Sequence, residues 1–151
     1  PVDINQVVEE AVISARVAGP QHPITFEPKG AEVFILGDQL RIHQVVANLL
    51  SNARSHTPAG TPIHVEINTS DSAIEIAVSD QGPGLSQEDQ KRIFERFYRA
   101  DGSRVRHGED GSGLGLSIVD AVMRAHGGSV SVQSELGKGA TFTLKFLTRE
   151  S

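Results

Sequence analysis

Residues 38–80 read DQLRIHQVVANLLSNARSHTPAGTPIHVEINTSDSAIEIAVSD, and the spacing of their apolar side chains changes halfway along. Up to about Arg54 these side chains recur every three or four residues, which predicts a helix with one apolar face. Residues 57–60 then break the pattern. Apolar and polar residues alternate over 63–68 and again over 73–79, which predicts an antiparallel hairpin. This stretch therefore indicates a helix layer packed against a sheet.

The flanking sequence extends the same arrangement in both directions. Asp3 can cap a helix that ends near Ala18, before Gly19 and Pro20. The other expected elements are short extended runs at 24–27 and 33–36, a short helix at 86–97, a mobile polar loop at about 99–112, a helix at 114–126, and strands at 129–133 and 140–147. This order predicts one α+β domain over residues 1–151, a two-layer α/β sandwich. Its sheet is expected to be mixed and mostly antiparallel, with about three helices on one face.

The composition of the 151 residues excludes several functions. The chain has no Cys, which rules out disulfides, thiol catalysis and cysteine metal sites. Its net charge is −5, it has no Trp, and no apolar run approaches the length of a membrane span. We therefore expect neither nucleic acid nor an anionic membrane surface as a partner. The chain begins at Pro1 rather than Met, and we interpret it as a piece of a longer protein.

Asn48 and Asn52 are four residues apart in the predicted helix and so lie one turn apart on one face. Both amides lie beside the apolar face, where a polar group without a partner is costly. One interpretation is that they are hydrogen-bonded structural amides. The other is that they face a ligand, because an amide oxygen suits a Mg²⁺ ion held mainly by phosphates and water.

A second motif, Asp80-Gln-Gly82-Pro-Gly84, directly follows the predicted strand 73–79. A carboxylate at a strand end can accept a hydrogen bond from an exocyclic amine such as that of adenine. The two glycines would let the backbone pass close to a flat ligand. The alternative is an ordinary Asp-Gly turn without a ligand.

A third motif places Gly111, Gly113 and Gly115 before the predicted helix 114–126. Backbone N–H groups at a helix N-terminus favour a polyphosphate, although a structural turn would use the same residues. The motif lacks the Lys of a Walker A loop and the surrounding strands of a dinucleotide site. Residues 91–106 hold six of the 14 basic side chains. Lys91 and Arg92 fit a solvated helix face, whereas the arginines of the loop, at 99, 104 and 106, can fold over a nucleotide and neutralise it.

Together these motifs resemble the catalytic ATP-binding domain of bacterial sensor histidine kinases, which has the Bergerat-type α/β sandwich. The resemblance spans residues 3–147 and rests on five boxes that stand in the family's order. They are Asn48-Leu-Leu-Ser-Asn52-Ala53, Asp80-Gln-Gly82-Pro-Gly84, Ile93-Phe94-Glu-Arg-Phe97-Tyr98-Arg99, Gly111-Ser-Gly113-Leu-Gly115-Leu116 and Gly137-Lys-Gly139-Ala-Thr141-Phe142.

The resemblance implies ATP and Mg²⁺ as ligands and assigns a role to each box. Asp80 is expected to bind the adenine amino group, with Gly82 and Gly84 shaping the pocket and Thr141 in the water-linked shell around Asp80. Asn52 is the expected metal ligand, and Asn48 and Arg99 are the expected catalytic residues beside the phosphates. The other expected nucleotide-binding residues are Ser55, His56, Tyr98, Gly111, Gly113, Leu114, Gly115 and Leu116, while Phe94 and Phe97 anchor a flexible ATP lid at about 99–112.

The sequence departs from the family at Ser55, where many members have Lys. The neighbouring Arg54 points about 100° away around the helix and cannot replace that Lys directly. We expect an arginine of the lid to supply the missing positive charge. The candidates are Arg99, Arg104 and Arg106.

The implied function is that of an ATP-dependent protein-histidine kinase in two-component signal transduction. The domain would donate the γ-phosphate of Mg-ATP to a histidine on the dimerisation domain of its parent kinase, which then passes it to the receiver domain of a response regulator. None of the six histidines stands in a phosphoacceptor motif, so we expect that domain outside this chain. The chain alone is then expected to be monomeric and unable to autophosphorylate. The parent is expected to be a homodimer in the bacterial inner membrane, with this part in the cytoplasm.

Two other functional classes share the fold. ATPases that resemble gyrase and mismatch-repair modules activate water with a Glu at the position of Asn48, and an amide cannot act as a general base. The other class comprises anti-sigma-factor serine kinases and domains that bind a partner without catalysis. The complete set of boxes and the charged segment before Gly111 favour the histidine-kinase branch.

Overall fold

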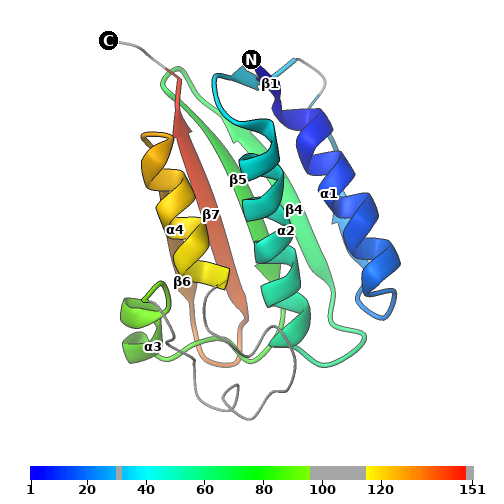
Figure 1. Ribbon diagram of the computed structural model, residues 1–151. Coiled ribbons are helices and arrows are strands. Elements are labelled where there is room, and N and C mark those ends of the chain that lie inside the picture. The colour runs from blue at the N-terminus through cyan, green and yellow to red at the C-terminus, as the bar shows by residue number, and fades with distance from the viewer. Residues whose placement is uncertain (30–31, 96–114, 149–151) are drawn as a thin grey trace.

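The computed structural model describes residues 1–29, 32–95 and 115–148. In this part of the chain a layer of helices covers one face of a five-stranded sheet (Figure 1). The elements in chain order are β1 (Val2–Asp3), α1 (Ile4–Ala18), β2 (Ile24–Phe26), β3 (Phe34–Ile35), α2 (Gln39–Ser55), β4 (Ile63–Thr69), β5 (Ala73–Asp80), α3 (Gln87–Arg92), α4 (Gly115–Ala125), β6 (Ser129–Ser134) and β7 (Ala140–Leu147).

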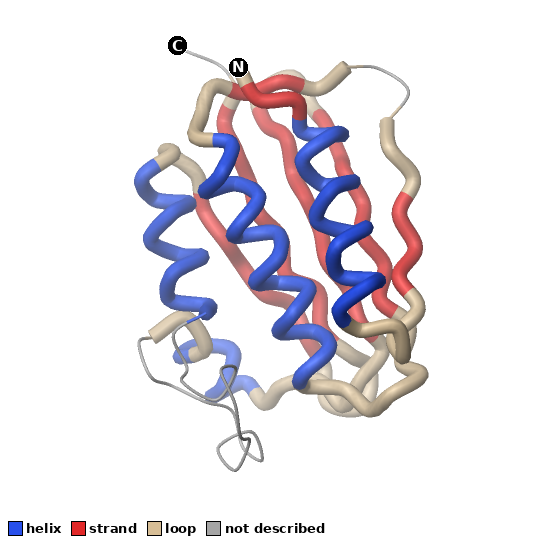
Figure 2. Tube along the Cα trace, turned by 45° about the vertical axis from the view of Figure 1, so that its right-hand side comes forward, coloured by secondary structure: helices blue, strands red, loops and turns tan. Residues whose placement is uncertain are grey.

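The three long helices, α1, α2 and α4, lie side by side on the sheet, as Figures 1 and 2 show from two directions. Local capping sets where the first two begin. The Asp3 carboxylate accepts the Gln6 N–H at 3.2 Å, and the Asp38 carboxylate accepts the Arg41 N–H at 3.3 Å. The apolar face of α2 is fully buried and packs against both neighbouring helices; it consists of Ile42, Val45, Val46, Leu49, Leu50 and Ala53. Among the described residues, every helix is too short or too polar to traverse a bilayer.

The sheet has the strand order β2-β4-β5-β7-β6. β2 is parallel to β4, and the other three pairings are antiparallel, which confirms the mixed, mostly antiparallel sheet. Val78 is paired with Val65 on one side and with Phe142 on the other, and all three are buried beneath the helices. The alternate residues are more polar and face the opposite side, as is usual in antiparallel sheets.

Of the expectations about the short elements, one is confirmed and one needs correction. The extended runs expected at 24–27 and 33–36 are confirmed as β2 and β3, and they belong to different sheets, because β2 pairs with β4 whereas β3 pairs with β1. The helix expected at 86–97 stops at Arg92. The chain turns at residues 93–95, where Ile93 places its side chain in the core at 5% exposure.

Four chain segments converge at the end of the sheet away from the N-terminus (Figure 1). They are the last turn of α2, the first turn of α4, the end of β5 and the start of β7. The predicted site residues of the described chain come mainly from these four segments. The fold therefore brings motifs that are far apart in the sequence to one edge of the sandwich.

Candidate functional site

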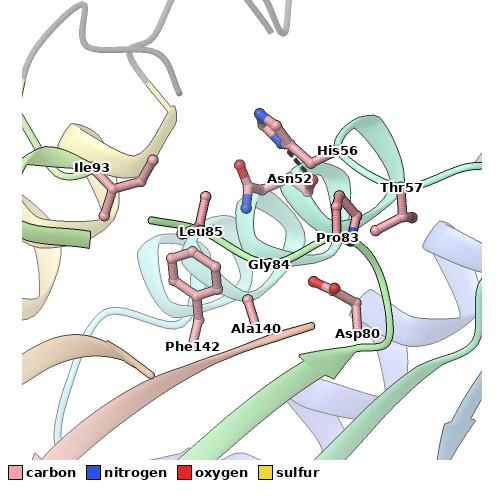
Figure 3. Close-up of a pocket in the computed structure, with 10 residues that line it drawn as sticks. All are labelled: Asn52, His56, Thr57, Asp80, Pro83, Gly84, Leu85, Ile93, Ala140 and Phe142. Carbon is pink, nitrogen blue, oxygen red and sulfur yellow. Dashed lines mark hydrogen bonds between the residues drawn. The ribbon is translucent and has the colours of Figure 1, made fainter. Parts of the chain in front are cut away.

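A pocket opens where β5 ends beside the last turn of α2 (Figure 3). It is open to solvent on one side and is lined by residues of both layers of the sandwich. Apolar Leu85, Ile93 and Phe142 lie toward one side of it, and Asp80 with Thr57 lies toward the other. The full lining consists of Asn52, His56, Thr57, Asp80, Pro83, Gly84, Leu85, Ile93, Ala140 and Phe142. A flat apolar ring with a polar edge fits such a lining.

Asp80 is the polar centre of this pocket. It is the last residue of β5 and lies two residues beyond the buried Val78, so its side chain points toward the helix layer. Its Oδ1 accepts the Gly82 N–H at 2.9 Å. Burial raises the pKa of Asp80 above the ordinary value of 3.8, while hydrogen bonds from Gly82 and Ala140 and the nearby His56 lower it. Because a carboxylate accepts several hydrogen bonds, these donors leave capacity for an amine in the pocket.

The glycines after Asp80 let the chain pass between two other segments. A Cβ on Gly82 would collide with the side chain of Thr57. Gly84 has a φ of 79°, and a Cβ there would collide with the carbonyl oxygen of Glu135. Glycine is therefore required at Gly84 on two grounds, backbone conformation and space.

The last turns of α2 supply the polar edge of the pocket. The Asn52 carbonyl accepts from His56 Nδ1 at 2.9 Å and from Ser55 Oγ at 3.3 Å. Because a carbonyl can only accept, His56 Nδ1 carries a proton, and its Nε2 is an acceptor when the ring is neutral. One turn earlier, Asn48 Nδ2 donates to the Gly115 carbonyl at 3.4 Å and so connects α2 with the start of α4. Asn48 thus has a structural partner, whereas the Asn52 side chain lines the pocket.

The described residues contain no group of three or more His, Asp or Glu side chains that could hold a metal ion. A divalent cation beside Asn52 would therefore take most of its ligands from phosphates and water. Mg²⁺ bound with ATP is commonly held in this way. The amide of Asn52 is chemically suited to such a site.

Two motifs of the sequence prediction can be placed only in part. Phe94 packs edge-on against Phe142, with ring centroids 6.1 Å apart, beside the pocket. Gly115 is the first residue of α4, and the side chain of Leu116 is buried in the core. The remaining predicted residues, Phe97, Tyr98, Arg99, Gly111, Gly113 and Leu114, lie outside the described residues, as does the expected lid at 99–112.

The structure does not bring Thr141 into the pocket. On β7, Ala140 is paired with Asp80 and lines the pocket, whereas Thr141 is paired with Ser79. The Thr141 hydroxyl lies 2.9 Å from that of Ser79, on the sheet face away from the helices. The expectation that Thr141 belongs to the surroundings of Asp80 is therefore wrong, and Ala140 is the residue of this motif that lies beside Asp80. Arg54 also lies elsewhere, since its side chain packs over Gly19 at the end of α1.

Sequence reasoning did not single out Thr57, Leu85 or Ala140. Thr57 is held from two sides, by the Ala53 carbonyl at 2.8 Å and by His22 Nε2 at 3.0 Å. Leu85 directly follows the glycine motif, and an apolar residue at that place is a signal that could have been used. Ala140 has no signal of its own, because only its pairing with Asp80 places it in the pocket.

Comparisons with known proteins show the family and the fold of this chain. Residues 37–150 match the family described as "Histidine kinase-, DNA gyrase B-, and HSP90-like ATPase". The chain is 44% identical over 137 residues to "Probable sensor histidine kinase TcrY" of Mycobacterium tuberculosis, a match that covers 91% of this chain and 29% of that protein. The "Mycobacterial sensor histidine kinase MprB" structure has a TM-score of 0.82 at 28% identity and covers 100% of this chain and 99% of that one.

A longer solved structure is also similar. Full-length ShkA, solved in complex with AMPPNP, has a TM-score of 0.77 at 31% identity, and the match covers 100% of this chain and 32% of ShkA. The chain spans about a third of the length of the curated relatives it matches, 29% of TcrY and 37% of SenX3 from Mycolicibacterium smegmatis.

Proposed function

Because this chain belongs to the family of histidine kinase-, DNA gyrase B- and HSP90-like ATPases and is the catalytic domain of a sensor histidine kinase, we propose that it binds Mg-ATP and donates the γ-phosphate to a histidine of its parent kinase. Domains of this family bind ATP. The acceptor histidine lies on the parent's dimerisation domain, and the phosphoryl group then passes to the receiver domain of a response regulator.

The observation that carries this proposal is the half-buried Asp80 carboxylate at the base of an apolar-walled pocket. The hydrogen bond from Gly82 holds this carboxylate, which points toward the space between Ala140 and Leu85. An adenine ring would bury its faces against the apolar walls and donate its amino group to this carboxylate. Adenine is favoured over guanine, because guanine presents a carbonyl oxygen in place of that amino group and would leave the carboxylate without a donor.

The phosphates would lie toward the end of α2 and the start of α4. Mg²⁺, when bound, neutralises phosphate charge and holds the phosphates in place. Asn52 would be its protein ligand, and Asn48 would lie beside the phosphates, held by its bond to Gly115. The proposed nucleotide site is completed by Ser55, His56, Tyr98, Arg99, Gly111, Gly113, Leu114, Gly115 and Leu116. A lid arginine would supply the charge that Ser55 lacks.

Phosphoryl transfer of this kind depends mainly on positioning and charge neutralisation, so the domain can act without a covalent intermediate. Several of its histidines have structural partners: His22 bonds Thr57, His64 bonds Thr25, and His126 bonds Asp38. We propose that another domain of the parent kinase supplies the acceptor, and that this parent is a homodimer anchored in the bacterial inner membrane. A covalent tether in that parent would raise the effective concentration of the two domains.

The first test is a calorimetric titration of ATP with and without Mg²⁺. Wild type should bind at one site, and omission of Mg²⁺ should weaken binding. Asp80→Asn should bind about ten- to a hundred-fold more weakly, because an amide has one acceptor atom where the carboxylate has two. The matched control is Asp71→Asn, an exposed aspartate in the turn between β4 and β5, which should bind like wild type.

Two outcomes of this titration would overturn the proposed site. One is that wild type does not bind ATP, and the other is that Asp80→Asn binds ATP as tightly as wild type does. Transfer is tested with γ-labelled ATP and the separately purified dimerisation domain of the parent. Phosphohistidine should form on that domain, and label on the isolated chain alone would contradict an acceptor that lies on another domain.

A further inference from the structure

The pocket wall formed by residues 83–85 lies outside every helix and strand, and two side chains outside the pocket hold it. Ser134, the last residue of β6, accepts the Leu85 N–H at 2.8 Å and donates its own hydroxyl to the Gly139 carbonyl at 2.6 Å. Gln90 of α3 donates from Nε2 to the Leu85 carbonyl at 3.1 Å and to the Ser134 carbonyl at 3.0 Å. Both backbone groups of Leu85 are therefore bound by side chains.

The neighbouring backbone strengthens the same connection. Gly137 N–H donates to the Pro83 carbonyl at 2.7 Å. Gly84 lies against Glu135 so closely that a Cβ would not fit. The wall is thus attached along its length to the turn between β6 and β7. Neither Ser134 nor Gln90 lines the pocket, so neither would touch a ligand there.

Gln90 also connects this wall with the next part of the pocket. It is in α3, three residues before Ile93, whose side chain lines the pocket. A shift of α3 would therefore move Leu85 and Ile93 together. A side-chain amide suits this place, because its NH₂ group has two donors and here meets two carbonyls.

We propose that Ser134 and Gln90 are positioning residues of the nucleotide site. By binding the backbone of Leu85, they hold its side chain in place against the base and so set the affinity for the base. The inference rests on the proposed function for the identity of the ligand. If Ser134 is replaced, the Leu85 N–H loses its acceptor, and if Gln90 is replaced, the Leu85 carbonyl loses its donor. In either case the wall at residues 83–85 becomes free to take other positions. Binding must then order the wall again, which lowers the affinity.

The test compares Ser134→Ala, Gln90→Met and wild type by calorimetric titration with adenosine and with Mg-ATP. Methionine keeps the length of the glutamine side chain and removes its donors. The matched control is Gln87→Met, which makes the same change at an exposed position of the same helix. Urea unfolding of wild type and the three variants is measured at several temperatures. The titrations are made at a temperature at which all four proteins are fully folded without urea.

Ser134→Ala and Gln90→Met should each bind about five- to thirty-fold more weakly, which corresponds to the loss of one or two hydrogen bonds. The factor should be the same for adenosine and Mg-ATP, because the change lies at the base. Gln87→Met should bind like wild type. A merely structural role would lower the unfolding midpoint and leave the affinity of the folded variants unchanged, and that result would overturn the inference.

Two further outcomes separate this inference from the function on which it rests. A loss confined to Mg-ATP, with adenosine unaffected, would overturn the positioning of the base wall and leave the proposed function standing. Wild type that binds neither adenosine nor Mg-ATP would overturn the proposed function itself.

Discussion

The turn between β6 and β7 contains two glycines with similar backbone angles, which differ in the space available for a Cβ atom. Gly137 and Gly139 have positive φ angles of 83° and 85°. A Cβ on Gly139 would collide with the Asp80 carbonyl oxygen and lie 3.0 Å from Gln81 Cα, whereas a Cβ on Gly137 would meet nothing within 4 Å. Gly139→Ala and Gly137→Ala therefore share the backbone penalty and differ in the collision with the chain at the pocket.

The two costs can be estimated separately. Alanine in a left-handed conformation costs about 1–2 kcal/mol, and the smaller entropy of its unfolded chain offsets about 0.4–1 kcal/mol of this. Gly137→Ala should therefore lower the free energy of unfolding by about 1 kcal/mol. Overpacking adds about 1–3 kcal/mol for Gly139→Ala, which brings its loss to about 2–4 kcal/mol. For a domain of this size, that loss lowers the melting temperature by about 4–16 °C.

The same pair of variants tests the link between this turn and the pocket. The collision in Gly139→Ala acts on the peptide that follows Asp80, so adenosine affinity should fall, whereas Gly137→Ala should retain wild-type affinity. The assays are urea unfolding and calorimetric titration of both variants at a temperature where each is folded. If Gly139→Ala is as stable as Gly137→Ala and binds adenosine equally well, the close approach of this turn to Asp80 is wrong.

Three further predictions concern the pocket and the helix layer. First, because the pKa of Asp80 is raised above 3.8, its charge is lost at a higher pH than that of an ordinary aspartate. Adenosine affinity should therefore fall as the pH drops from neutral toward that pKa, and Asp80→Asn should bind independently of pH over this range; an equal pH dependence in both proteins would contradict this. A raised pKa means that the folded state favours the protonated form of Asp80, and this stabilising effect is complete below pH 3.8 and disappears as the pH rises through the native pKa. Urea unfolding should therefore show that wild type loses stability relative to Asp80→Asn as the pH rises through this window. Second, Ala140→Leu should fill the pocket and abolish adenosine binding while overpacking lowers the free energy of unfolding by about 1–3 kcal/mol, so the domain stays folded; Ala121→Leu, at an exposed position of α4, is the control, and normal binding by Ala140→Leu would place the base elsewhere. Third, His126→Leu removes the acceptor of the Asp38 N–H at 3.1 Å and the edge-on contact with Phe146, so thermal unfolding should show a loss of about 1–2 kcal/mol; no loss relative to the control His43→Leu would mean that this contact between α4 and α2 does not stabilise the fold.

The spacing of side chains in the sequence was sufficient to predict the long helices and the two hairpins. Helical and strand periods differ, and Asp3 caps its own helix through residues next to it, so these features depend on neighbours in the chain. The same reasoning placed Asp80, Gly82 and Gly84 on one turn at a strand end, and the structure has them there. It also predicted the face shared by Asn48 and Asn52.

Only the tertiary structure decided which distant segments meet. The parallel pairing of β2 with β4 and the shorter α3 depend on packing against residues far away in the sequence. Ala140 and Thr141 show the limit most clearly, because both stand in one motif and only one of them lines the pocket. A shift of one residue in a strand moves a side chain to the other face of the sheet. The pairing of Ala140 with Asp80 determines which face each side chain takes, and that pairing exists only once β7 lies against β5.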